Sequence, residues 1–199
     1  MLKSVYIFYL FFIFILITHI LLFFYCQIDG CSNLAEGGDG IFVEATLEFG
    51  QKWALVGPNK IIQTQGGYVD EDDYVCFAHP FNAHFMTTSY FGWPKLTAKI
   101  YKLDETDTID LVSYGTMNMP ITPGYHECTC DTWSLHGGIK QETFSYFLDS
   151  KPIMTNNDPV SKRPNYREFL VTKPGPKIHI NIEVMMKNFK NNQYNLSKI

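Results

Sequence analysis

Ile178-His-Ile-Asn-Ile-Glu-Val-Met-Met186 carries the clearest structural signal in the chain. Apolar side chains stand at every second position from Ile178 to Met186, and His179, Asn181 and Glu183 stand between them. Successive side chains of a β-strand point to opposite faces of a sheet, so a period of two predicts a strand with one buried and one wet face. The stretch is therefore expected to be a half-buried strand.

The same alternation recurs upstream. Ile41 to Phe49 places Glu44, Thr46 and Glu48 between apolar residues, and Leu96 to Tyr101 repeats the pattern. Shorter apolar runs predict the remaining strands, at residues 74–78, 81–86, 111–119, 125–130 and 166–171. Leu21 to Ile28 is equally compatible with a first strand. These runs predict an all-β antiparallel sandwich of about seven to nine strands.

Proline and glycine residues suggest where the strands are interrupted or connected. Pro80 is expected to split residues 74–86 into two pieces, and Lys173-Pro-Gly-Pro176 is expected to form a turn. Apolar residues three or four apart in Gly138 to Leu148 predict one short helix inside a connection. Gly115 is expected to mark a bulge or a close approach of two strands.

Composition, net charge and cysteine content limit the classes of function that fit this chain. Of the 199 residues, 46% are hydrophobic and 18% are charged, which is typical of a folded domain. The formal net charge of −4 argues against broad binding of nucleic acid, because phosphate backbones attract basic surfaces. The five cysteines are odd in number and irregularly spaced, which favours reduced thiols over a disulfide framework.

The N-terminal segment has three interpretations. Val5 to Tyr25 is an uncharged apolar run, long enough to cross a bilayer as a helix. It is also compatible with a spurious or unusual N-terminal extension. As a cleaved signal peptide it is too long in its apolar part and lacks a small-x-small cleavage site. We treat residues 1–20 as an apolar extension, 21–190 as one domain and 191–199 as a polar tail. Contact with a membrane stays open.

No residues predict chemistry. No nucleophile motif or phosphate-binding glycine loop occurs, so neither a catalytic site nor a cofactor is expected. His79 and His84 are five apart, an odd offset that points them to opposite faces of a strand, and no metal site is expected there. Asp70 to Asp73 forms an acidic loop. It is either a solvated loop or, together with Asp104 and Asp107, a calcium site.

A rigid corner is expected where Phe91-Gly92-Trp93-Pro94 leads into a strand, because Pro94 fixes its own φ and restricts Trp93. Trp93 is interpreted as a core residue, with an anchor for a partner protein as the alternative. Gly92-Trp93-Pro94-Lys-Leu96 also resembles the G-W-P-[KR]-L segment of the B9-domain family.

Further segments resemble that family in order and spacing, from about Leu22 to Lys190. They are Cys26-Gln-Ile-Asp-Gly30, Gly50-Gln-Lys-Trp53, Ala78-His79-Pro80-Phe81, His84-Phe85, Tyr114-Gly115, Pro120, Pro123-Gly124, Thr132-Trp133 and Lys187-Asn188-Phe189. Cys26 stands where the family has a glycine. The resemblance singles out twelve residues as structural or partner-facing: Trp53, His79, Pro80, Gly92, Trp93, Pro94, Gly115, Pro123, Gly124, Trp133, Asn188 and Phe189.

The resemblance implies a C2-like sandwich that acts as a non-enzymatic scaffold. Members of the family assemble with other B9-domain proteins in the transition-zone complex at the base of cilia, where they support ciliogenesis and a diffusion barrier. It implies a location in the cytoplasm and cytoskeleton, at the ciliary basal body and transition zone. The alternatives are a lipid- or calcium-binding module and a single-pass membrane protein with an extracellular sandwich.

Overall fold

Nine antiparallel strands make up the part of the chain that the computed structural model describes, which is residues 20–34, 40–57, 60–104, 108–135 and 171–188. The strands are β1 (Ile20–Ser32), β2 (Gly40–Glu48), β3 (Trp53–Leu55), β4 (Ile61–Gln63), β5 (Tyr74–Thr87), β6 (Lys95–Leu103), β7 (Ile109–Asn118), β8 (Gly124–Leu135) and β9 (Thr172–Lys187). Their order in the sheet is β3-β5-β1-β9-β8-β7-β6-β2-β4. The predicted all-β antiparallel fold is confirmed.

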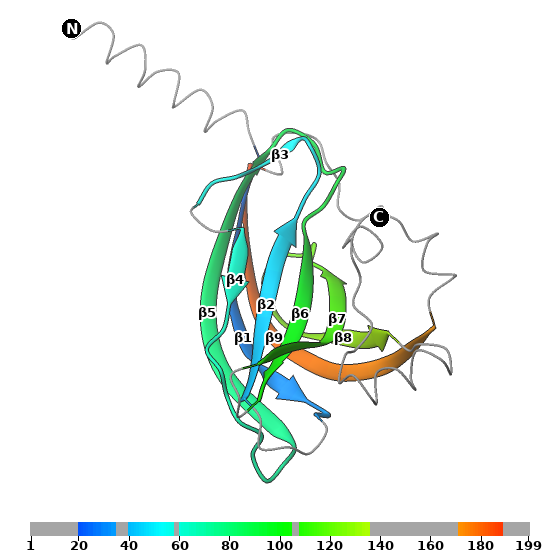
Figure 1. Cartoon of the computed structure of the whole chain (residues 1–199). Helices are drawn as coiled ribbons and strands as arrows, with labels where there is room; N and C mark the ends of the chain where they lie inside the picture. The colour runs from blue at the N-terminus through cyan, green and yellow to red at the C-terminus, as the bar shows by residue number, and fades with distance from the viewer. Residues whose placement is uncertain (1–19, 35–39, 58–59, 105–107, 136–170, 189–199) are drawn as a thin grey trace, which may run out of the picture.

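The two layers of the sandwich belong to one bent sheet. β7 and β8 pair only through Tyr114 with Trp133 and Gly115 with Thr132, and the sheet turns over at this short junction. Figure 1 shows β2, β6 and β7 lying in front of β1 and β9. One hydrophobic cluster fills the space between the layers and draws side chains from both.

Alternation along the strands creates this core. In β9, Ile178, Ile180, Ile182 and Val184 are each at most 2% exposed, whereas Glu183 between them faces water. Burying one such aliphatic side chain contributes about 1.5–3 kcal/mol. β1 flanks this part of β9 on one side and β8 on the other. The strand predicted from the period of two is thus the apolar centre of its layer.

The predicted break at Pro80 is wrong, because β5 runs continuously through it. Pro80 lies opposite Gln27 of β1, and the other neighbour of β5, β3, begins to pair only at Phe85. Pro80 therefore sits on an open edge, where its missing N–H costs no ladder hydrogen bond. The irregularity is instead a bulge near Ala78, whose φ is 46°.

The predicted turn at Lys173 to Pro176 is also wrong, since these residues extend β9. Pro174 lies opposite Trp133 of β8, and pairing with β1 begins only at Lys177. The prolines occupy an end of β9 that has one neighbour, so extended geometry is compatible with them. β3 and β4, of three residues each, were not predicted because such short strands show no period.

The remaining predicted segments lie partly inside and partly outside the residues that the structure describes. Of the two interpretations left open for Leu21 to Ile28, the structure shows the strand, because β1 covers these residues. The helix expected at Gly138 to Leu148 lies outside the described residues, as does the strand expected at 166–171 except for Val171. Among the residues described, no helix is long and apolar enough to span a membrane.

Candidate functional site

Two glycines cross in backbone contact at the corner expected before β6. Gly50 N–H donates a 2.9 Å hydrogen bond to the carbonyl of Gly92. Gly92 has a φ of +80°, and a Cβ added to it would lie 2.6 Å from the Cα of Gly50. Such a contact is far inside van der Waals distance, so only glycine fits at this crossing.

Trp53 and Trp93 lie next to this crossing and stabilise the corner through hydrogen bonds to backbone carbonyls. Trp53 Nε1–H donates to the carbonyl of Phe91 at 2.9 Å, and Trp93 Nε1–H donates to the carbonyl of Met119 at 2.9 Å. Their rings meet edge to face, with centroids 5.2 Å apart. Pro94 accepts a hydrogen bond from Met119 N–H at 3.1 Å. Both indole N–H groups are satisfied, as partly buried polar groups require.

Phe85 connects the corner to the hydrophobic core by packing against aromatic rings of both. Its ring meets Phe49, Trp53 and Phe24 edge to face, at centroid distances of 5.3, 5.9 and 6.0 Å. Phe24 and Phe85 belong to one layer, whereas Phe49 directly follows β2 of the other. The structure thus gathers Trp53, Gly92, Trp93 and Pro94 into a corner that joins the layers. Their role in binding a partner stays a prediction.

A second pair of motif residues lies where the sheet bends. Gly115 faces Thr132, and a Cβ on Gly115 would lie 2.9 Å from Thr132 Cγ2. The Trp133 ring stacks on Tyr114 with centroids 5.3 Å apart. Gly115 marks a close approach of β7 and β8, while the register shift of β7 lies at Val112.

The remaining motif residues are scattered. His79 and Pro80 lie in β5, where His79 Nδ1 is 3.3 Å from the side-chain oxygen of Gln65. Pro123 and Gly124 are exposed at the start of β8, and Asn188 follows β9 with a φ of 67°. Phe189 lies outside the described residues. The twelve residues therefore do not converge on one site.

In the acidic loop, one carboxylate accepts hydrogen bonds from backbone N–H groups nearby in the chain. Asp70 Oδ1 accepts hydrogen bonds from Asp72 N–H at 3.0 Å and from Tyr74 N–H at 2.9 Å. Such bonds shape a loop without any ion. Within the described ranges, no group of three or more His, Cys, Asp or Glu residues is placed to hold a metal ion, and Asp107 lies outside those ranges.

The five thiols are unpaired, and most are buried. Burial raises the pKa of Cys26, Cys31 and Cys130 to about 12 in each case, and the nearby Cys128, Cys130 and Asp131 respectively add a smaller upward effect. A buried thiol with a raised pKa stays protonated at neutral pH and is a poor nucleophile. Cys76 alone among them is exposed.

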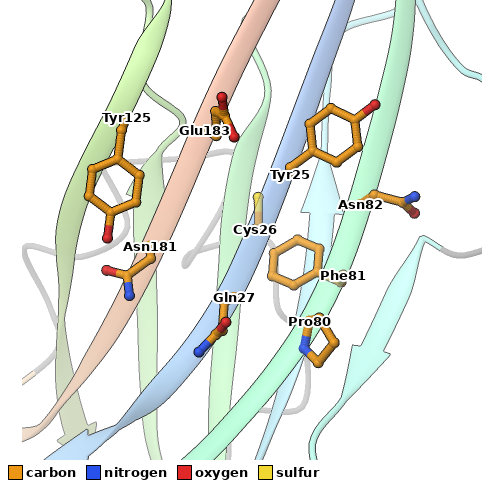
Figure 2. Close-up of a pocket in the computed structure, with 9 residues that line it drawn as sticks. All are labelled: Tyr25, Cys26, Gln27, Pro80, Phe81, Asn82, Tyr125, Asn181 and Glu183. Atoms are coloured by element: carbon orange, nitrogen blue, oxygen red, sulfur yellow. The ribbon is translucent and has the colours of Figure 1, made fainter.

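A groove of about 530 Å³ lies on the outer face, by which we mean the side of β5, β1, β9 and β8 turned away from the core. Nine residues line it: Tyr25, Cys26, Gln27, Pro80, Phe81, Asn82, Tyr125, Asn181 and Glu183. Figure 2 shows Tyr125 and Tyr25 on either side of Glu183, with Asn82 beyond Tyr25. Apart from Pro80, these residues were not predicted as site residues.

A usable signal for this groove was present in the sequence. Glu183 and Asn181 occupy wet positions of the half-buried strand predicted from Ile178 to Met186. Tyr25 lies in the run at residues 21–28, one position out of phase with its buried neighbours. What the sequence lacked was the strand order, which alone brings β1 and β8 to the two sides of β9.

Comparison with known proteins identifies relatives over most of the chain. The family described as "Ciliary basal body-associated, B9 protein" (B9-C2) matches residues 22–185. B9 domain-containing protein 2 of Homo sapiens is 29% identical over 82% of this chain and 91% of its own length. B9 domain-containing protein 1 of Xenopus laevis is 23% identical over 79% of this chain and 80% of its own.

A solved structure is similar at a greater distance. A C2 domain of plant Extended Synaptotagmin 1 superposes with a TM-score of 0.47 and 10% sequence identity, covering 84% of this chain and 95% of that domain. Because the family match spans residues 22–185 and so includes the glycine crossing, its two tryptophans and the outer face, this chain belongs to the ciliary basal body-associated B9 protein family.

Proposed function

We propose that this protein is a non-enzymatic scaffold subunit of the transition-zone complex at the base of cilia. It acts there by binding other B9-domain proteins, and it supports ciliogenesis and the ciliary diffusion barrier. It needs no cofactor for this role. Its place is the cytoplasm and cytoskeleton at the basal body. Family membership supports this proposal, because the family is described as associated with the ciliary basal body.

The outer face is the observation that carries a binding role. Large side chains stand exposed on it: Tyr25 is 44%, Met185 47% and Tyr125 62% exposed. A sheet whose second face turns to water ordinarily shows polar residues there, and exposed aromatic residues that gather on one surface mark sites of protein contact. Tyrosine is among the residues that contribute most to binding energy at such contacts.

Affinity purification from ciliated cells tests the proposal. The full chain is tagged, and its partners are identified by quantitative mass spectrometry. We expect other B9-domain proteins to be recovered in amounts comparable with the bait, and the tagged chain to localise at the ciliary base. Recovery without any B9-domain protein, or a tagged chain spread evenly through the cell, would contradict the proposal.

A matched control separates folding from binding. Gly92→Ala disrupts the glycine crossing and is expected to lower the yield of folded bait, whereas Tyr125→Ala removes an exposed ring and leaves the fold intact. Loss of the partners from the well-folded Tyr125→Ala bait therefore reports on the surface itself.

A further inference from the structure

We propose that the groove on the outer face binds an arginine side chain of the protein partner, with Glu183 as the counter-charge and Tyr25 and Tyr125 on its two sides. This inference rests on the proposed scaffold function and names the chemistry of its contact. The register of the strands decides which side chains share the groove.

A single row of paired residues crosses four strands. Glu183 of β9 lies opposite Tyr125 of β8 and also opposite Tyr25 of β1, and Tyr25 in turn lies opposite Asn82 of β5. Directly paired residues of antiparallel strands point to the same side, with Cβ atoms about 4.5–5.5 Å apart. Two phenol rings therefore stand beside one carboxylate on the same surface, as Figure 2 shows.

The charge of the groove is one-sided. Among its nine lining residues, Glu183 is the only one that carries a formal charge at neutral pH. Glu183 is exposed and pairs with no cation among the residues described. A lone carboxylate between aromatic rings favours a cation, because the ring faces and the carboxylate both attract positive charge.

The polar residues of the groove favour a guanidinium over other cations. The side-chain N–H of Gln27 donates to Asp29 at 3.2 Å, so the Gln27 amide oxygen is left as an acceptor, and Asn181 and Asn82 offer two more amide oxygens. A guanidinium carries five N–H donors, binds a carboxylate through two of them and stacks on aromatic rings. A quaternary ammonium, such as a choline headgroup, has no N–H donor for these amides.

The adjoining row adds an apolar contact. Phe23 lies opposite both Met185 and His84, and its ring meets His84 edge to face at 5.0 Å between centroids. Met185 is 47% exposed. The groove thus has an exposed apolar side chain beside its carboxylate, and methionine, arginine and aromatic residues are all enriched at protein interfaces.

The first test needs no partner. The full chain, labelled with ¹⁵N, is titrated with arginine methyl ester and followed by NMR. We expect saturable shifts at the amides of Tyr25, Tyr125 and Glu183, and at least about tenfold weaker binding by Glu183→Gln. Citrulline methyl ester, which keeps the α-amino group and nearly the same shape but has a neutral urea in place of the guanidinium, is expected to cause no such shifts. Absence of shifts with arginine methyl ester, or equal shifts with citrulline methyl ester, would overturn the proposal.

The second test uses a B9-domain partner recovered in the purification. Binding by the wild-type chain is compared with Glu183→Gln and Tyr125→Ala, with the exposed loop variant Glu71→Gln as a control for net charge. We expect Glu183→Gln and Tyr125→Ala each to weaken binding about tenfold or more, and Glu71→Gln to leave it unchanged. Unchanged binding by Glu183→Gln would overturn the arginine groove while leaving the scaffold function in place.

Other outcomes separate the two proposals. Saturable binding of arginine methyl ester by a chain that captures no B9-domain protein would support the groove and contradict the scaffold function. Phosphatidylcholine vesicles provide the remaining comparison. If they shift the amides of Tyr25, Tyr125 and Glu183 where arginine methyl ester does not, a lipid headgroup is the occupant and the arginine proposal is wrong.

Discussion

Gly92 shows how one residue determines whether the two layers meet. Its left-handed φ of +80° and its contact with Gly50 are separate demands, and both exclude a side chain. Gly92→Ala adds backbone strain and a methyl group 2.6 Å from a backbone carbon. We expect a loss of about 3–4 kcal/mol in the free energy of unfolding, measured in urea.

Two other glycines separate these effects. Gly124 has a φ of +121° with nothing within 4 Å of an added Cβ, and Gly66 has neither a positive φ nor a neighbour. Gly124→Ala is expected to cost about 1–2 kcal/mol from strain alone. Gly66→Ala is expected to change stability by less than about 1 kcal/mol. A Gly92→Ala variant no less stable than Gly124→Ala would contradict the contact.

The buried thiols predict a dependence of stability on pH. Cys26, Cys31 and Cys130 have a pKa raised from an ordinary 9.0 to about 12 in the folded state. Between pH 9 and 12 the unfolded chain therefore binds fewer protons than the folded one, so stability falls as the pH rises through this window and is fully present below pH 9.

Replacing one buried cysteine measures how much its thiol contributes to the pH dependence of stability. Each thiol contributes a slope of about 1.4 kcal/mol per pH unit to the free energy of unfolding. Cys31→Ala is expected to lower the total slope between pH 9 and 12 by about that amount. Cys76→Ser is the control, because Cys76 is exposed. An unchanged slope in Cys31→Ala would show that this thiol already titrates in the folded protein near its ordinary pKa.

At the scale of individual strands, the sequence predicts the structure best where one face of a strand is buried. Alternation found β2, β6 and β9, because a half-buried strand imposes its period directly on the residues. The apolar run that forms β1 only left a first strand open as one of its interpretations. It did not find β3 or β4, which are too short for a period, or the passage of β5 through Pro80. That passage depends on where β3 ends, and pairing between distant segments is not written in local sequence.

Buried and exposed positions of β9 are expected to respond differently to mutation. Ile180 is 1% exposed, whereas Met185 on the same strand is 47% exposed. Ile180→Ala is expected to cost about 2–5 kcal/mol, because it removes a packed side chain and leaves a cavity. Met185→Ala is expected to cost within about 0.5 kcal/mol. Equal losses in urea unfolding would contradict the assignment of the two faces.

Strands in the middle and at the edges of the sheet should differ in hydrogen exchange. β9 pairs on both sides from Ile178 to Val184, whereas β4 pairs only with β2 and β3 only with β5. We expect amides of β9 to exchange only by global unfolding and those of β4 to exchange by local opening, many times faster. Amides of β4 that exchange as slowly as those of β9 would contradict this order.

In the molecule as a whole, most motif residues lie away from the groove, and Pro80 is the one that also lines it. The motif residues Trp53, Gly92, Trp93 and Pro94 gather at a corner that joins the layers, and they could be picked out from the sequence. The groove around Glu183 could not, because Tyr25, Glu183 and Tyr125 come from three strands far apart in the chain and meet only through the strand order.

Radical footprinting of the complex with a B9-domain partner is the sharpest test of the binding surface, because it reports oxidation of individual exposed side chains. Tyr25, Met185 and Tyr125 lie on the outer face, while Tyr68 and Phe91 are exposed elsewhere at 72% and 70%. We predict that oxidation of the first three residues falls on binding while that of Tyr68 and Phe91 does not change. Protection of Phe91 with an unchanged outer face would contradict binding through the outer face.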